Sequence, residues 1–341
     1  EKDVTMNIGK KNSSGHGPWH SSRKISGSSV WGRGDFVHIC FESCGCRFRK
    51  QGYCMMCDYG AGDNVTETEA VEILDHVLRG RPVPRRLLLG TCGSILDGSE
   101  MSRTVLMKIL QYLQNTDIEY IIFETHYTTV SRGILYELKN MLPGKTVAIE
   151  MGFESSNPNV LKHSLHKVMD LGQLKQVMHG IADVQMEIIL NVFLGAPGLS
   201  VKEQLEDALE AVNWAYGHGA HEVVIFPANI KPGTKLWELY QTGKYERVSH
   251  WLLIKLLGKL TEEQLGRTAV SWYGDRQDAG NDLDILPPEA CDQCRPVLME
   301  FYRRFMNDFD ASSREALLKE VKSQVSCSCL GSVDEKLYGG V

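Results

Sequence analysis

Three cysteines near the N-terminus have a spacing that suits a metal centre. In the segment GCRFRKQGYCMMCDYG, Cys46 precedes a C-x-x-C pair formed by Cys54 and Cys57. Three thiolates can bind three irons of a [4Fe–4S] cluster and leave the fourth iron open for a ligand. A structural zinc site normally closes with four ligands, and Cys44 or Cys40 would then supply the fourth thiolate. The spacing therefore indicates a cluster with an open iron, with a structural zinc site as the alternative.

A second group of cysteines lies near the C-terminus, where Cys291 and Cys294 form a C-x-x-C pair and Cys327 and Cys329 form a C-x-C pair. Two chelating pairs complete either a tetrahedral zinc site or a fully ligated iron–sulfur cluster. Two disulfides are the third possibility. Because the chain has ten cysteines and shows no secretory signal, we expect metal binding in a reducing, cytoplasmic compartment.

Length and charge narrow the class of protein. The chain has 341 residues, 43% of them hydrophobic, which suffices for one large α/β domain and a smaller second one. The formal net charge of −6 does not predict a nucleic-acid surface, although basic runs occur at RFRK (47–50) and RGRPVPRR (79–86). No apolar run approaches the roughly 18 residues of a membrane-spanning helix, so we expect no membrane partner.

Apolar strands alternate with amphipathic helices through the middle of the chain. Continuous apolar strands of this kind are typical of a parallel sheet that is buried on both faces. The carboxyl ends of such strands meet at one edge, which is where function gathers in parallel α/β folds, and the first cysteine loop follows the first strand. Six βα units fit either an incomplete barrel or a doubly wound sheet. The expected strands are 36–41, 85–90, 119–124, 145–152, 186–195 and 221–229, and the expected helices are 66–80, 101–115, 130–141, 157–178 and 200–219.

The chain divides into three parts by pattern. Residues 1–34 are rich in Gly, Ser and His without a clear period, so we expect a loosely packed N-terminal extension. Residues 35–245 carry the strand–helix alternation. After about residue 236 the strand pattern stops, and 246–341 is expected to be a helical subdomain that carries the second cysteine group. Its expected helices are 248–264, 296–308 and 312–325.

The cysteine loop resembles that of the radical S-adenosylmethionine (SAM) superfamily. The usual signature there is C-x3-C-x2-C. The C-x7-C-x2-C of this chain resembles the branch that contains the archaeosine synthase radical SAM subunit and, more distantly, the elongator-type enzymes. Met56 is a departure, because the family commonly has an aromatic residue there. Four further segments resemble the family in the same order along the chain: GTCGSILDGSE (90–100), VAIEMGFESSNPNVLKHSLHK (147–167), FLGAPG (193–198) and IFPANIKPGTKLWELYQTGKY (225–245).

The resemblance implies a partial (β/α)6 barrel and two cofactors, a [4Fe–4S] cluster and SAM. Reductive cleavage of SAM would yield a 5′-deoxyadenosyl radical that abstracts a hydrogen atom from the substrate. It also favours a second, auxiliary [4Fe–4S] cluster over zinc at the C-terminal cysteines. A low-potential electron donor such as flavodoxin or ferredoxin is then an expected partner. By position, the residues implied to bind SAM are Met56, Gly93, Ser94, Glu124, Glu150, Glu154, Gly195, Pro197 and Asn229.

Several of these positions also have an ordinary structural interpretation. The three carboxylates could pair with lysines such as Lys167, and Gly195 with Pro197 could simply shape a turn. Cys92 is either a small buried residue or a donor that returns a hydrogen atom to a substrate radical, a role for which Cys40 and Cys44 compete. His126 follows the third strand, where packing is more common than substrate contact.

Three functions remain open from the sequence. The leading hypothesis is a radical SAM enzyme that acts on a small molecule, such as a sugar, a nucleoside or another metabolite of a biosynthetic pathway. The outcome would be epimerisation, oxidation or rearrangement. The alternative is a tRNA-modification subunit, because the branch that the chain resembles acts on tRNA; the net charge of −6 stands against it. The third hypothesis is a non-catalytic iron–sulfur or zinc scaffold.

Overall fold

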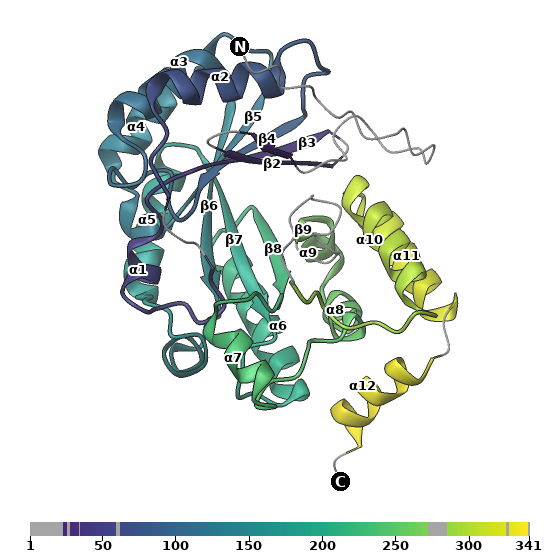
Figure 1. Cartoon of the computed structure of the whole chain (residues 1–341). Coiled ribbons are helices and arrows are strands. Elements are labelled where there is room, and N and C mark those ends of the chain that lie inside the picture. The colour runs from purple at the N-terminus through teal and green to yellow at the C-terminus, as the bar shows by residue number, and fades with distance from the viewer. Residues whose placement is uncertain are drawn as a thin grey trace, which may run out of the picture.

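The computed structural model describes residues 23–25, 28–33, 35–58, 62–271, 285–324 and 327–339. Their strands form one sheet in which spatial order follows chain order, and Figure 1 shows that this sheet curls into a partial barrel. β1 and β2 pair antiparallel at one edge, and β3 to β9 are parallel. The strands are β1 Arg23–Ile25, β2 Ser28–Arg33, β3 Phe36–Phe41, β4 Arg86–Thr91, β5 Tyr120–Thr125, β6 Thr146–Glu154, β7 Glu187–Leu194, β8 Glu222–Pro227 and β9 Thr268–Val270.

Long helices cover the convex face of the sheet (Figure 1). Their starts are marked by side chains that accept backbone N–H groups of the first turn, as at Thr66 and Ser200, where a glutamate three residues later completes a capping box. Each helix then buries its apolar stripe against the strands. These helices are α2 Glu67–Leu78, α3 Arg103–Gln114, α4 Arg132–Met141, α5 Leu171–Asp183 and α6 Val201–Gly217.

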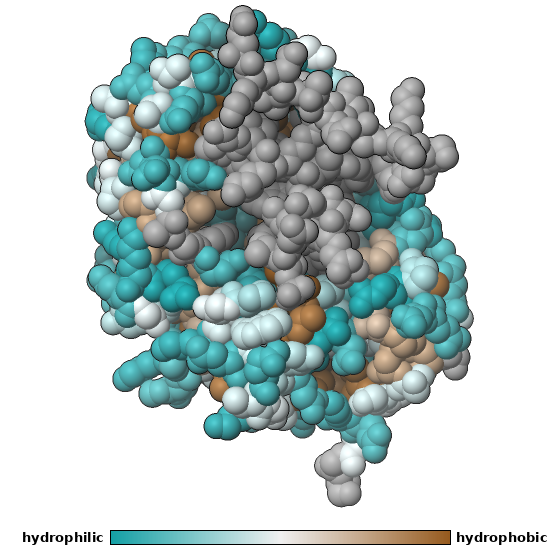
Figure 2. Space-filling model, in the orientation of Figure 1, coloured by the Kyte–Doolittle hydropathy of each residue, from teal (hydrophilic) through white to brown (hydrophobic). Residues whose placement is uncertain are grey.

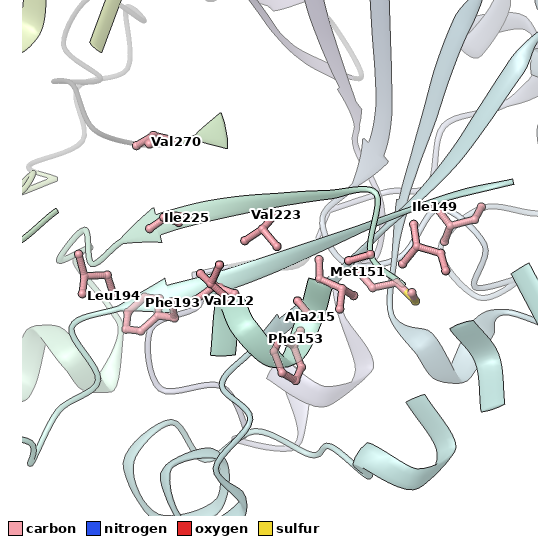
Figure 3. Close-up of a cluster of buried hydrophobic side chains, with 14 of the residues drawn as sticks. Ile149, Met151, Phe153, Phe193, Leu194, Val212, Ala215, Val223, Ile225 and Val270 are labelled. Carbon is pink, nitrogen blue, oxygen red and sulfur yellow. The ribbon is translucent and has the colours of Figure 1, made fainter. Parts of the chain in front are cut away.

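Alternation along each strand divides the side chains between two cores, because successive residues point to opposite faces. Odd-numbered residues of β6 and β8, such as Ile149 and Ile225, pack against the helices, and Figure 3 shows this cluster together with Val212 of α6. The opposite face lines the inside of the barrel. Its apolar layer consists of Leu88, Ile122, Ala148, Ile189, Val224 and Ala269.

Polar side chains lie on both sides of that apolar layer. At the amino ends of the strands, Arg86 pairs with Glu222 at 2.8 Å, and the Tyr120 hydroxyl donates to Glu187. Two positions further along the strands, toward their carboxyl ends, stand Glu124, Glu150 and Asn191. The apolar layer therefore separates the polar pairs at the amino ends of the strands from the polar residues near their carboxyl ends, where function gathers in barrels of parallel strands.

A helical region follows the barrel and is held to it by a buried arginine. Arg314 of α11 donates hydrogen bonds to four backbone carbonyls, those of Leu265, Thr268, Phe305 and Asp308. These carbonyls belong to the ends of several elements, so one side chain ties α9, β9 and α10 together. The helices of this region are α8 His250–Leu257, α9 Glu262–Gly266, α10 Arg295–Asn307, α11 Ala311–Gln324 and α12 Ser328–Tyr338.

The predicted fold class, a partial barrel followed by a helical region that carries four cysteines, is confirmed, and several expected elements need correction. The strand pattern does not stop after residue 236, because β9 adds a seventh parallel strand that is too short to show a period. Within the expected N-terminal extension, β1 and β2 add two strands to the sheet. Residues 1–22, 26, 27 and 34 of that extension lie outside the described residues.

Two expected helices are also interrupted. The helix expected at 157–178 is a short π-helical turn, Val160–Ser164, followed by α5, because the Asp170 side chain accepts the first N–H groups of a new helix. The helix expected at 248–264 is split into α8 and α9, because Thr261 caps a second start. No helix among the described residues is long and apolar enough to cross a membrane. The residues coloured in Figure 2 are mostly hydrophilic on that face, with small hydrophobic patches.

Candidate functional site

A cavity lies at the carboxyl edge of the parallel strands, where the interior of the barrel opens. It gathers residues from loops that are far apart in sequence. Side chains not predicted from the sequence also line it, among them Phe48, Lys167 and Asn191. The predicted residues on its wall are Cys46, Cys54, Met56, Cys57, Gly93, Ser94, Glu124, Glu154 and Asn229.

Backbone hydrogen bonds hold the first cysteine loop against three separate elements. The Cys46 N–H donates to the Cys92 carbonyl at 3.1 Å, beside the end of β4. The Cys54 N–H donates to the His166 carbonyl at 2.9 Å, and the Met55 carbonyl accepts the Leu236 N–H at 3.0 Å, from α7 (Lys235–Gln241). Cys54 itself has a φ of 59°, a region that side chains other than glycine rarely adopt. Unusual backbone of this kind concentrates at functional sites.

A buried cation lies beside two of the thiols. Lys167 is 8% exposed, and its Nζ is 3.0 Å from Oε1 of Glu154. Burial disfavours the charged form, but the Glu154 carboxylate and the nearby Cys54 thiol raise the pKa of Lys167 above its ordinary value. Burial raises the pKa of Cys54, and Lys167 opposes that rise. Lys167 is therefore a permanent positive charge, which favours thiolates that bind a metal centre of net negative charge.

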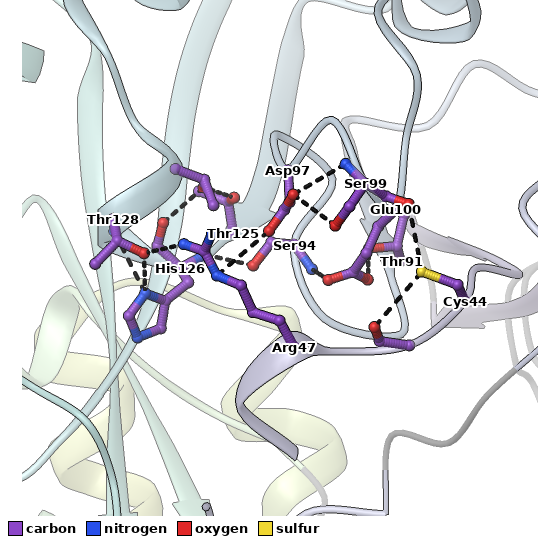
Figure 4. A network of polar contacts seen from close by, with 12 residues as sticks. Cys44, Arg47, Thr91, Ser94, Asp97, Ser99, Glu100, Thr125, His126 and Thr128 are labelled. Atoms are coloured by element: carbon purple, nitrogen blue, oxygen red, sulfur yellow. Dashed lines mark hydrogen bonds and ion pairs between the residues drawn. The ribbon is translucent and has the colours of Figure 1, made fainter. Parts of the chain in front are cut away.

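Glu100 joins the cysteine loop to the loop after β4. Its carboxylate accepts hydrogen bonds from the Ser43 and Thr91 hydroxyls, both at 2.9 Å, and from the Ser94 N–H at 3.1 Å. Figure 4 shows this carboxylate beneath Ser94 and Thr91. A Cβ on Gly93 would lie 2.3 Å from Glu100 Oε1, so only glycine fits there. The sequence offered no signal for Glu100, because its partners are not adjacent to it in the chain.

The floor of the cavity is rich in hydrogen-bond acceptors. Burial, together with the neighbouring Glu150 carboxylate, raises the pKa of Glu124 to about 8. Oε2 of Glu124 lies 3.8 Å from Nε2 of His38. The Asn191 side chain is 5% exposed, and its Oδ1 has no hydrogen-bond partner among the described residues. A buried acceptor without a donor is costly, so this position favours a ligand that supplies an N–H or O–H group.

One wall of the cavity is aromatic. The rings of Phe48 and His126 lie 4.3 Å apart between centroids. The backbone N–H of His126 donates to the Ser94 hydroxyl at 3.0 Å, and the ring Nδ1 of His126 lies 2.8 Å from the Thr128 hydroxyl, as Figure 4 shows. Burial, and then the charge of Lys167, lowers the pKa of His126 to about 3. The imidazole is therefore neutral at physiological pH and offers a flat, uncharged face.

Four predicted residues do not line the cavity. The Cys92 thiol contacts Cys40, and this hydrogen bond is the main cause that lowers the pKa of Cys92. Glu150 is buried beside Asn191, one strand from Glu124. Gly195 has a φ of 110°, and a Cβ there would lie 2.1 Å from Val248, while its carbonyl accepts from the Tyr245 hydroxyl at 2.6 Å. Pro197 lies buried in the same turn. For the last two residues, the placement favours the turn-shaping role.

The second cysteine group forms a compact cluster away from the cavity. The Sγ atoms of its four members all lie within 4.8 Å of one another. Among the described residues, it is the single set of three or more metal-ligating side chains gathered this closely. The two cysteine pairs that the sequence predicted to form one site are thus close together in space. Its members are Cys291, Cys294, Cys327 and Cys329.

Comparisons with known proteins find distant relatives. No family model matches the chain. Archaeosine synthase subunit beta of Methanosarcina acetivorans is 22% identical over 299 residues, which cover 84% of each chain. The protein of the same name from Thermococcus kodakarensis is 24% identical over 70% of this chain and 75% of its own. The solved radical S-adenosylmethionine methyltransferase TsrM of Kitasatospora setae has a TM-score of 0.49 and 10% identity, over 83% of this chain and 60% of its own. The chain thus has a distant similarity, over most of its length, to proteins named archaeosine synthase subunit beta.

Proposed function

We propose that this chain is a radical SAM enzyme that modifies a nucleoside within RNA, of which tRNA is the first candidate. One observation carries the proposal: Cys46, Cys54 and Cys57 line a single cavity at the carboxyl edge of a parallel partial barrel. The distant similarity to archaeosine synthase beta subunits supports the RNA substrate over the small-molecule reading. The expected epimerisation has no support, because the candidate donor Cys92 does not line the cavity.

The donor set suits a [4Fe–4S] cluster with one iron left for SAM. Among the described cysteines, only these three line the cavity. The rival fourth ligand, Cys44, instead donates from its thiol to the Ser99 carbonyl at 3.3 Å. Lys167 provides a buried positive charge beside the thiols. These contacts favour three thiolate ligands over the four of a structural zinc site.

The residues of this chain would share the work around those cofactors. Gly93, Ser94 and Glu154 line the cavity together with the three cysteines and are suited to the polar end of SAM, and Met56 and Asn229 line the same cavity. When bound and reduced, the cluster and SAM supply one-electron chemistry that activates an unreactive C–H bond. The protein binds, orients and shields the reacting groups from water.

The rest of the cavity suits a nucleobase. Asn191 would receive an N–H group of a base edge, and the carboxyl of Glu124, largely protonated at neutral pH, would donate or accept a second hydrogen bond there. The neighbouring rings of Phe48 and His126, tilted by 40° to each other, would lie against its face. The short helix α1 (Arg47–Lys50) follows Cys46 directly, and its exposed Lys50 is placed to contact phosphate groups. The other basic run is less suited, because Arg86 pairs with Glu222 at the amino end of the barrel.

The test is production of 5′-deoxyadenosine by the anaerobically reconstituted protein with SAM and a strong reductant. We expect formation that increases when unfractionated tRNA is added and does not increase with the same tRNA digested to nucleosides. Cys46→Ala is the negative control and should give none. Stimulation by the digest alone would restore the small-molecule substrate, and no product under any condition would favour the non-catalytic scaffold.

A further inference from the structure

The sulfur atoms of the C-terminal cysteine group are too close together for an iron–sulfur cluster. Sγ of Cys294 lies 3.4 Å from Cys291 and 3.3 Å from Cys329. Sγ of Cys329 lies 3.0 Å from Cys327 and 3.5 Å from Cys291. With a Zn–S distance of about 2.3 Å, a tetrahedron separates its sulfurs by about 3.8 Å. A four-iron cluster places its irons and sulfides between the cysteine sulfurs, which then lie farther apart than the ligands of one ion.

The same distances exclude disulfides in this arrangement. A disulfide joins its sulfurs at about 2.05 Å, and all four cysteines are free in the structure. Moreover, Cys329 lies close to three other sulfurs, and a disulfide would pair it with one of them. Four sulfurs that are mutually close but unbonded are the arrangement that surrounds a single ion.

Two helix starts meet at this group. Cys294 directly precedes α10, and Cys327 directly precedes α12, and neither side chain accepts a capping hydrogen bond from its own helix. The amino end of a helix carries a partial positive charge that stabilises a nearby anion. Four thiolates around a divalent ion carry a net charge of −2. The partial positive charges of the two helix starts offset part of this remaining negative charge.

The remaining contacts of α12 among the described residues are few. Its Asp334 pairs with Lys255 of α8, whose Nζ also lies 5.7 Å from the centroid of the Tyr338 ring. The buried residues of α12 are Val333 and Leu337, and its Lys336 pairs with Glu246 on the exposed surface. An isolated helix of this length is marginal in water, so an anchor at its start matters. None of the four cysteines lines the cavity of the first cysteine loop.

We propose that Cys291, Cys294, Cys327 and Cys329 bind one Zn²⁺ ion, which joins the start of α12 to the start of α10 and takes no part in electron transfer. This inference differs from the auxiliary cluster that the sequence favours, and it is independent of the proposed function. A closed tetrahedral set leaves no position for substrate, as in structural zinc sites.

Metal content of the full chain, purified anaerobically and then reconstituted with iron and sulfide, tests the proposal. We expect about one zinc and about four irons per chain. Cys46→Ala should lose the iron and keep the zinc, and Cys327→Ser with Cys329→Ser should lose the zinc and keep the iron. About eight irons without zinc, or loss of half the iron in the C-terminal variant, would overturn the proposal.

A second measurement does not depend on how the variants fold. Wild-type protein produced with Co²⁺ in place of zinc should show the intense visible bands of a tetrahedral cobalt thiolate, and Cys46→Ala should show them equally. Absence of those bands in protein that retains cobalt would contradict the four-thiolate site. Failure of the proposed function would change the iron counts but neither the zinc content nor the cobalt bands, because the two sites share no residue.

Discussion

Alanine in place of Gly93 should damage the first cysteine site, whereas the same change at Gly98 in the same loop should be harmless. A Cβ on Gly93 would lie 2.3 Å from Glu100 Oε1 and 2.8 Å from the Cys46 Cβ. Ordinary contact requires about 3.4 Å or more, so either the buried carboxylate or Cys46 must move by roughly 1 Å. At Gly98, a Cβ would have no atom within 4 Å.

The cost follows from overpacking of a filled site, which is about 1–3 kcal/mol. For a chain of this size, the melting temperature should fall by roughly 2–6 °C, because 1 kcal/mol shifts a domain of 150–250 residues by about 2–4 °C and a larger one by less. Displacement of Cys46 should also reduce reconstituted iron, whereas Gly98→Ala should stay within about 0.5 kcal/mol of wild type. Differential scanning fluorimetry and iron analysis measure both. A Gly93→Ala protein with unchanged melting temperature and full iron would refute the reasoning.

Three further predictions address single side chains. Lys167→Met should lower iron content because it removes the buried charge beside Cys54, and Lys167→Arg should retain more of the iron; equal iron in both would contradict this role. Arg314→Met should lower the free energy of unfolding by about 2–4 kcal/mol in urea titrations, because it leaves buried carbonyls unpaired, whereas the surface variant Arg303→Met should cost little. Because the pKa of Glu124 is raised to about 8, its contribution to the free energy of unfolding is present at acid pH and is lost as the pH rises toward 8. Glu124→Gln should flatten this decline in urea titrations at several pH values. A decline that the substitution leaves unchanged would assign the effect to other groups.

The sequence could predict whatever depends on local pattern. Continuous apolar runs located both ends of six parallel strands to within two residues, because a strand that is buried on both faces must be apolar throughout. Nine of the predicted site residues line one cavity, because they follow strand ends that meet at the same edge. The short β9 was missed because three residues carry no period.

Contacts across the sheet could not be predicted in this way. Glu100 accepts hydrogen bonds from Ser43, 57 residues earlier in the chain, and from Thr91, 9 residues earlier. The residues next to Glu100 in the sequence indicate neither partner. Asn191 faces the cavity because it stands at an inward position of β7, which a fully apolar strand pattern does not distinguish from an outward one. The closeness of the four C-terminal sulfurs likewise depends on how two helix starts are docked, and the sequence, which favoured a cluster with zinc as the alternative, could not give it.

The seven residues between Cys46 and Cys54 have a structural reason that also bears on substrate. They contain α1, and two of its three basic side chains bind the protein itself. Arg47 donates to the Thr128 hydroxyl at 2.8 Å, and Arg49 donates to the carbonyls of Cys57 and Gly233 at 2.8 and 3.1 Å. The longer spacing therefore attaches the cysteine loop to the segments that follow β5 and β8. The three-residue gap of the usual C-x3-C-x2-C signature has no room for a helix that could do this. Arg47 and Lys50 are both exposed, but Arg47 also lies 3.5 Å from Asp97 Oδ2. Under the proposed function, any phosphate contact by α1 would therefore rest mainly on the single charge of Lys50, and substrate binding would depend mainly on the cavity.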